Sequence, residues 1–164
     1  MAAIPPGEIE TATNRSWFDS FVAEHGDRLR RALLAANGVQ VGNDACADAL
    51  AWAWEHHDRL AGMEHPVAYL FRVGQTSARR QRRWHREISL PSEIPTDDDV
   101  SEGSGRLEVA LGRLNVKQRT VVILVHAHGW SYDEVAEGVG LSVASVRSHL
   151  HRGMKRLREE MERS

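Results

Sequence analysis

The segment Ser131–Leu150 restricts the fold more than any other part of the sequence. Its first residue and Glu134 have the spacing of a capping box, which predicts that a short helix begins there. Gly140 suits the left-handed residue that ends a helix, and Ser142 is placed to cap a second helix. Two helices joined by so short a turn cross steeply, and Ala136 is small enough to let them approach. The segment therefore predicts a helix-turn-helix.

The rest of the chain also has the pattern of helices. Apolar residues between Phe18 and Ala36 recur at spacings of three, four and seven, which places them on one stripe of a helix. The cluster Val121–Val125 is β-branched, but its flanks are helix-like and we interpret it as a buried helix. In the first half of the chain we predict helices over 16–37, 44–57 and 66–83. The expected fold class is all-α.

Residues 88–105 have the composition of a linker. They hold two prolines, two glycines and three consecutive aspartates. This acidic stretch is either a solvated loop or a strand mimic that occupies a basic channel of a partner. We predict two small helical domains, 14–87 and 106–162, joined by an acidic flexible linker.

The net charge of −2 conceals strongly basic segments, one of which is the second helix of the helix-turn-helix. At about 100° per residue, hydroxyl and cationic side chains lie away from the seam formed by Val146 and Leu150. A plain helical hairpin would also carry a capping box and a glycine. Serine and arginine, however, suit phosphates and base edges in a major groove. The predicted duplex-contacting residues are Ser142, Ser145, Arg147, Ser148, His149, Arg152 and Lys155.

A second basic segment runs from Arg79 to Arg86 and includes Trp84. Proteins grip single-stranded nucleic acid by combining positive charge with an aromatic side chain on which a base stacks. The alternative is a charged, solvated helix end. We interpret the segment as a second nucleic-acid site.

Several classes of protein fit the sequence poorly. A single cysteine, Cys46, excludes an intramolecular disulfide, and we expect a reducing, cytoplasmic setting without membrane insertion. The nine histidines prompt the hypothesis of a metal-dependent enzyme. However, His149 and His151 diverge around a helix, and His126 and His128 have no acidic or cysteine partner at ligand spacing. No glycine-rich phosphate loop or nucleophile elbow occurs. We expect no catalytic activity, no metal and no cofactor.

Two segments resemble the sigma-70 family, especially the small extracytoplasmic-function sigma factors of bacteria. The likeness to region 2 covers Trp17–Trp84 and is carried by AWEHHDRL (53–60), PVAYLFRV (66–73) and the arginine run. The likeness to region 4 is strong over Leu114–Glu159, with matching residue types at Arg119, Glu134, Ala136, Gly140, Ser142, Val146, Arg147, Ser148, Leu150 and Arg152.

The resemblance implies a dissociable subunit of bacterial RNA polymerase that directs promoter-specific initiation. Region 4 would recognise the −35 element, and region 2 would bind core RNA polymerase and melt the −10 element of promoter DNA. An anti-sigma factor is a further implied partner. Residues at the matching core-binding positions are Asp44 and Asp48, and those at the −10 positions are Gln75, Thr76, Arg79, Arg80, Arg82, Arg83 and Trp84.

The likeness in region 2 is weaker than in region 4. Ala47 stands where the family usually has glutamine, Gln75-Thr76 replaces the usual Arg-Asn, and an acidic residue expected before the arginines is missing. Two alternatives therefore accompany the sigma-factor interpretation. One is a sigma-like regulator that binds duplex DNA without initiating transcription by itself. The other is a repressor or response-regulator output domain with a similar C-terminal part.

Overall fold

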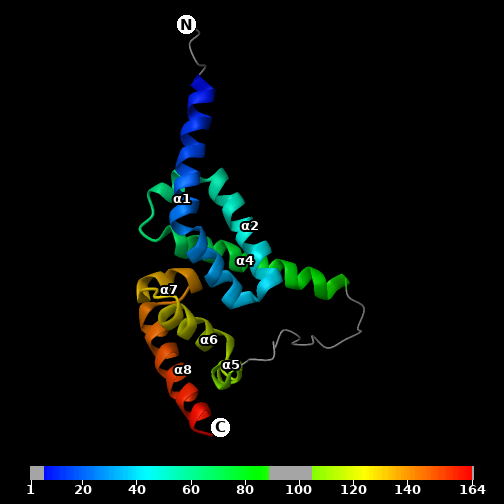
Figure 1. Cartoon of the computed structure of the whole chain (residues 1–164), viewed down its shortest axis with the longest axis vertical. Helices are drawn as coiled ribbons and strands as arrows, with labels where there is room; N and C mark the ends of the chain where they lie inside the picture. The colour runs from blue at the N-terminus through cyan, green and yellow to red at the C-terminus, as the bar shows by residue number, and fades with distance from the viewer. Residues whose placement is uncertain (1–5, 89–104, 164) are drawn as a thin grey trace. The chain divides into compact units, whose positions relative to one another are not determined.

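The computed structural model describes residues 6–88 and 105–163, with side chains over 13–84 and 105–163. Every regular element in these ranges is helical, as predicted (Figure 1). The chain forms two compact units. The first contains the described residues up to Arg79 together with 137–139, and the second contains the other described residues. The predicted acidic linker lies almost entirely outside the described residues, and the exact domain limits stay predictions.

The N-terminal half of the chain forms α1 (Pro6–Asn37), α2 (Val39–Glu55), α3 (His57–Ala61) and α4 (Pro66–Ile88). The first unit contains α1–α3 and α4 up to Arg79. The chain reverses between α1 and α2 at Gly38, whose φ of 81° lies in the region that glycine tolerates best. Gly42 then lets α2 approach α1 closely, because a Cβ there would lie 2.7 Å from the Cα of Leu34. The core between these helices is formed by Leu29, Ala32, Leu33, Ala45, Ala49, Leu70 and Phe71.

Helix boundaries in this unit differ from the sequence-based prediction. The helix expected from Ser16 begins at Pro6, a residue whose fixed φ and missing N–H suit the first turn. The helix expected from about Asp44 begins directly after Gly38 and ends at Glu55, where the short α3 was not predicted. A serine or aspartate inside a helix cannot be told from an N-cap by its local sequence, so tertiary packing decides whether the helix begins there or continues through it. The predicted end at Asn37-Gly38 is confirmed.

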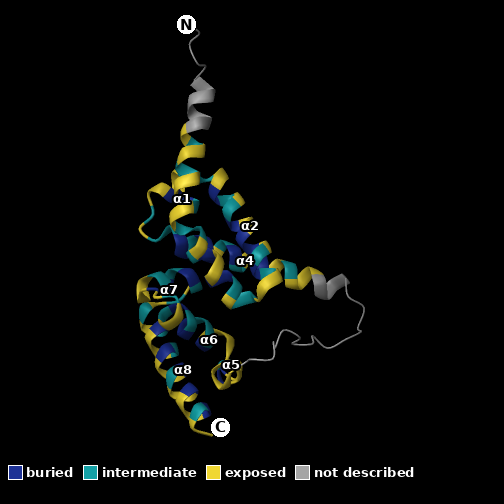
Figure 2. Ribbon diagram, in the orientation of Figure 1, coloured by how far each residue is buried: buried dark blue, intermediate teal, exposed yellow. Residues whose placement is uncertain are grey.

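The C-terminal half of the chain forms α5 (Arg106–Gly112), α6 (Val116–Val122), η1 (Ile123–Ala127), α7 (Tyr132–Val139) and α8 (Val143–Arg163). All of these residues except 137–139 belong to the second unit. Helix α6 crosses α8 at Gly153, where a Cβ would lie 2.8 Å from Cγ2 of Val122. The carboxylate of Glu160 pairs with Arg113, which ties the end of α8 to the C-terminal end of α5. Figure 2 shows the buried stripe along α8, made up of Val146, Leu150, Gly153, Leu157 and Glu160.

The β-branched cluster Val121–Val125 is helical, as predicted, but it spans two helix types. The α-helix ends at Val122, and a π-helix follows in which the N–H of His128 donates to the carbonyl of Ile123. Val121, Val122 and Leu124 are buried. The extra residue in the π-turn shifts which side chains face inward, a local change that apolar periodicity does not reveal.

Candidate nucleic-acid interface

The turn between α7 and α8 has the geometry expected of a helix-turn-helix. The N–H of Ser131 donates to the Glu134 carboxylate at 2.8 Å, and the N–H of Glu134 donates to the Ser131 hydroxyl at 3.1 Å. Both bonds of the predicted capping box are therefore present. Gly140 adopts the left-handed conformation, with φ 71° and ψ 41°, and the N–H of Leu141 closes the helix end on the carbonyl of Ala136.

Ser142 caps α8, as the sequence predicts. Its hydroxyl accepts a hydrogen bond from the N–H of Ser145 at 3.1 Å and donates one to the Ser145 hydroxyl at 2.9 Å. The cap fixes the direction in which α8 leaves the turn. Val146 and Leu150 are buried, so the opposite side of the helix faces outward.

Most of the predicted duplex-contacting residues lie on that outward side. Those exposed are Ser142, Arg147, Ser148, Arg152 and Lys155. Ser145 and His149 are half-buried, and Nδ1 of His149 has no hydrogen-bond partner among the described residues. The first two turns of α8 thus present hydroxyls and one arginine together, with two more cations in the following turns.

Tyr132 belongs to this surface but was not predicted from the sequence. The Arg147 guanidinium lies 5.7 Å from the centre of its exposed ring, within the range of a cation–π contact. Tyr132 is the first residue of α7, whereas Arg147 is in the second turn of α8. Its sequence signal is weak, since an aromatic residue after a cap is common in any helix.

The arginine run forms the exposed end of α4. Arg79, Arg80, Arg82 and Arg83 are exposed, and Trp84 presents 63% of its surface. The two residues that depart from the family pattern precede the run on the same helix. Gln75 is half-buried, and the Thr76 hydroxyl donates to the carbonyl of Arg72 at 3.0 Å.

A stack of rings on α2 and α4 was also missed by the sequence analysis. The His56 and Trp52 rings are parallel within 6°, with centroids 4.2 Å apart, and Tyr69 lies 5.1 Å from Trp52. The exposed guanidiniums of Arg59 and Arg72 each lie 5.7 Å from the Tyr69 ring. The His56–Trp52 contact follows from their i, i+4 spacing, whereas only the fold brings Tyr69 to them.

The predicted polymerase-binding aspartates lie on one face of α2. Asp44 and Asp48 are both exposed and four residues apart, so their carboxylates lie about one turn apart. The buried hydroxyl of Ser77 donates to the Asp48 carboxylate, which links α2 to α4. Asp48 therefore also stabilises the first unit, whereas Asp44 has no such contact among the described residues.

Other kinds of site have little support among the described residues. They contain no group of three or more His, Cys, Asp or Glu that could hold a metal ion. Within the same residues, no helix is long and apolar enough to cross a membrane. Cys46 is buried, and this burial raises the pKa of its thiol, which keeps it in the less reactive protonated form.

Comparison with known sequences gives consistent matches. The family model for sigma-70, region 4 matches residues 104–157. An RNA polymerase sigma-E factor of Streptomyces avermitilis is 32% identical over 157 residues, covering 88% of this chain and 85% of that protein. The ECF RNA polymerase sigma factor SigL of Mycobacterium tuberculosis is 29% identical over 161 residues, covering 91% of this chain and 89% of SigL.

Solved structures share the fold. The sigma factor RpoE, in complex with the anti-sigma factor NepR from Bartonella quintana, has a TM-score of 0.68 at 24% identity, covering 88% of this chain and 96% of that one. CnrH, in complex with the cytosolic domain of CnrY, has a TM-score of 0.61 at 24% identity, covering 90% and 88%.

Proposed function

The chain belongs to the extracytoplasmic-function RNA polymerase sigma factors of the sigma-70 family, and we propose how its two units divide the recognition of a promoter. A sigma factor directs promoter-specific initiation of transcription. In this division α8 contacts duplex DNA at the −35 element. The first unit binds core polymerase, and the arginine run of α4 binds the separated strands of the −10 element.

The helix-turn-helix carries this proposal. Its capping box, left-handed Gly140 and capped α8 fix a rigid helix whose first two turns expose Ser142, Arg147 and Ser148. A helix held in this way fits the major groove, and its free N-terminal N–H groups and hydroxyls suit phosphates. Arg147, steadied by Tyr132, is placed to contact a base edge.

The arginine run of α4 and the ring stack of Trp52, His56 and Tyr69 are each proposed to bind single-stranded DNA. Exposed arginines attract the backbone, and the exposed ring of Trp84 can hold an unpaired base by stacking. The rings of Trp52, His56 and Tyr69 are half-buried. Arg59 and Arg72 bring positive charge directly to the rings. The ring stack is proposed as an addition to the −10 residues expected from the sequence, and it supports strand binding despite the departures at Gln75 and Thr76.

The proposed contact with core polymerase uses the outward face of α2. Asp44 and Asp48 present carboxylates there, with the small side chains of Ala47 and Ala51 exposed between and beside them. Such a face is flat and acidic, which suits a basic helix of a partner. Asp44 is the better residue to test, because Asp48 also accepts the hydrogen bond of Ser77.

An anti-sigma factor is proposed as a regulatory partner. RpoE forms a complex with the anti-sigma factor NepR, and CnrH forms a complex with the cytosolic domain of CnrY. In the second unit of this chain, Leu107, Val109 and Val116 each expose more than half of their surface. Exposed apolar side chains of this size suit a protein partner.

Run-off transcription tests the proposal most directly. Purified chain and core RNA polymerase are combined on a template that carries the chain's own upstream region, and a discrete transcript is expected only when both are present. Asp44→Lys should abolish the transcript and the co-purification with core while leaving duplex affinity unchanged. If the chain binds duplex DNA but neither binds core polymerase nor yields a transcript, it would instead be a duplex-binding regulator.

A further inference from the structure

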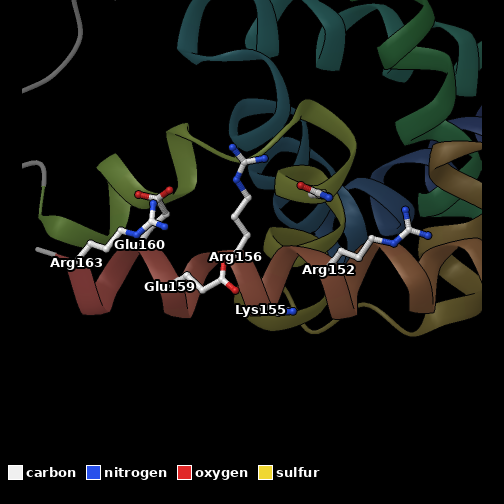
Figure 3. A pocket seen from close by; sticks show the side chains of 7 residues that line it. Arg152, Lys155, Arg156, Glu159, Glu160 and Arg163 are labelled. Atoms are coloured by element: carbon white, nitrogen blue, oxygen red, sulfur yellow. The ribbon is translucent and has the colours of Figure 1, made fainter.

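A hollow of about 430 Å³ opens beside the C-terminal half of α8 (Figure 3). Its size is in the range of pockets that hold small ligands or parts of larger ones. One lining residue, Gln118, comes from α6. The other six are Arg152, Lys155, Arg156, Glu159, Glu160 and Arg163, all from α8. The hollow lies wholly within the second unit.

The lining has an excess of positive charge. It holds four cations against two carboxylates, and the carboxylate of Glu160 is already paired with Arg113, which lies outside the hollow. In the part of the chain that the structure describes, no carboxylate lies within ion-pair distance of Arg152 or Arg156. Figure 3 shows both side chains extending from the same side of α8. Neighbouring cations repel one another, so an anion bound between them is favoured.

Gln118 adds a second feature of a binding site. Its side chain is only 8% exposed, and its buried Oε1 has no hydrogen-bond partner among the described residues. A buried polar atom without a partner costs free energy, so the site favours a ligand or an ordered water that supplies one. A half-turn of the amide exchanges this oxygen for the NH₂ group, which donates to an anion.

The position of the hollow along α8 indicates which anion reaches it. The 21 residues of α8 span about 32 Å, whereas a major groove is about 12 Å wide. The segment Val143–Arg152 already extends about 14 Å, which is more than the groove width, so a helix that crosses the groove would bring Arg156 and Arg163 to its edge. The groove is bordered by phosphates.

We propose that this hollow binds a phosphate group of the DNA backbone, with Arg156 as its principal cation. The first half of α8 then contacts bases, and the second half holds the strand that borders the groove. This inference rests on the proposed function, because it requires that α8 enters duplex DNA. It adds Arg156, Arg163 and Gln118 to the DNA-contacting residues, none of which was expected from the sequence.

The salt dependence of duplex binding tests the assignment. The full chain is titrated with a labelled duplex at several salt concentrations, and the slope of log affinity against log salt is compared between variants. Arg156→Gln should lower the magnitude of the slope by about one, equally on a promoter duplex and on an unrelated duplex. Arg158→Gln is the matched control, since Arg158 is an exposed cation of α8 that does not line the hollow. An unchanged slope for R156Q, or an equal change for R158Q, would overturn the DNA assignment.

A second probe separates DNA phosphate from free phosphate. Inorganic pyrophosphate is titrated into the wild type and R156Q. If R156Q keeps the DNA slope but loses pyrophosphate binding, the hollow takes free phosphates and the backbone contact is wrong. If R156Q matches the wild type in both the DNA salt slope and pyrophosphate binding, the hollow binds no phosphate. If the wild type binds no duplex, the proposed function fails, while the pyrophosphate titration still reports on the hollow.

Discussion

Arg147 is held by contacts that precede any encounter with DNA. Its guanidinium rests on the Tyr132 ring at 5.7 Å, so part of the rotamer entropy that binding would cost has already been lost. We expect Arg147→Ala to weaken binding to a promoter duplex by about 1–3 kcal/mol and to relax preference at one base pair. Fluorescence anisotropy with matched and single-substituted duplexes measures both. Arg158→Ala should leave the preference intact, and an equal loss on every duplex for R147A would point to a phosphate contact.

Glu160 gives the second unit a pH-dependent contact. The hydrogen bond from Arg113 holds the pKa of this carboxyl below its ordinary value of 4.5, with nearby arginines acting in the same direction against a smaller effect of burial. A lowered folded-state pKa means stability that is present above about pH 4.5 and is lost as the pH falls through the folded-state pKa. Glu160→Gln should therefore lower Tm near neutral pH, and the difference from wild type should shrink on acidification. Thermal unfolding at several pH values, with Glu159→Gln as the control, checks this; a difference that does not change with pH would contradict it.

At the scale of elements, the close approach of α1 and α2 depends on Gly42. A Cβ there would lie 2.7 Å from the Cα of Leu34 and 2.8 Å from the carbonyl oxygen of Leu33, and neither backbone atom can move without shifting the helix. We expect Gly42→Ala to lower the free energy of unfolding by about 1–3 kcal/mol. Gly62→Ala is the control, because nothing lies within 4 Å of a Cβ at that position. Urea denaturation of the full chain compares the two, and equal stabilities would show that α1 and α2 can separate at little cost.

The elements themselves were predicted unevenly. The helix-turn-helix was predicted to the residue, since each of its two N-caps joins residues only three positions apart and its left-handed turn needs a single glycine. The start of α1 was not predicted, nor was the separate α3, whose N-terminal end has no capping side chain and therefore leaves little trace in the sequence. The π-helix at Ile123–Ala127 was likewise hidden within an apolar run.

At the scale of the whole molecule, the proposed division of labour predicts two separable defects. Arg82→Ala combined with Arg83→Ala should impair strand opening more than duplex binding, since these exposed residues belong to the arginine run proposed to bind single-stranded DNA. Arg147→Ala should do the reverse. Permanganate footprinting of opened promoter DNA and anisotropy on closed duplex measure the two steps separately. Identical phenotypes for the two variants would refute the division.

The sequence by itself determined the helical class, the helix-turn-helix and the outward face of α8. Each depends on residues close together in the chain, whose spacing fixes capping, turning and helical phase. The tertiary structure alone decided which distant side chains meet. Tyr69 joins the rings of Trp52 and His56, Ser77 reaches Asp48 across 29 positions, and Arg113 reaches Glu160 across 47. Such contacts depend on how helices cross and turn, and these angles are set by packing at residues such as Gly42 and Gly153. The helix-turn-helix could therefore be predicted from the sequence alone, whereas the ring stack and the cationic hollow form only when the helices pack.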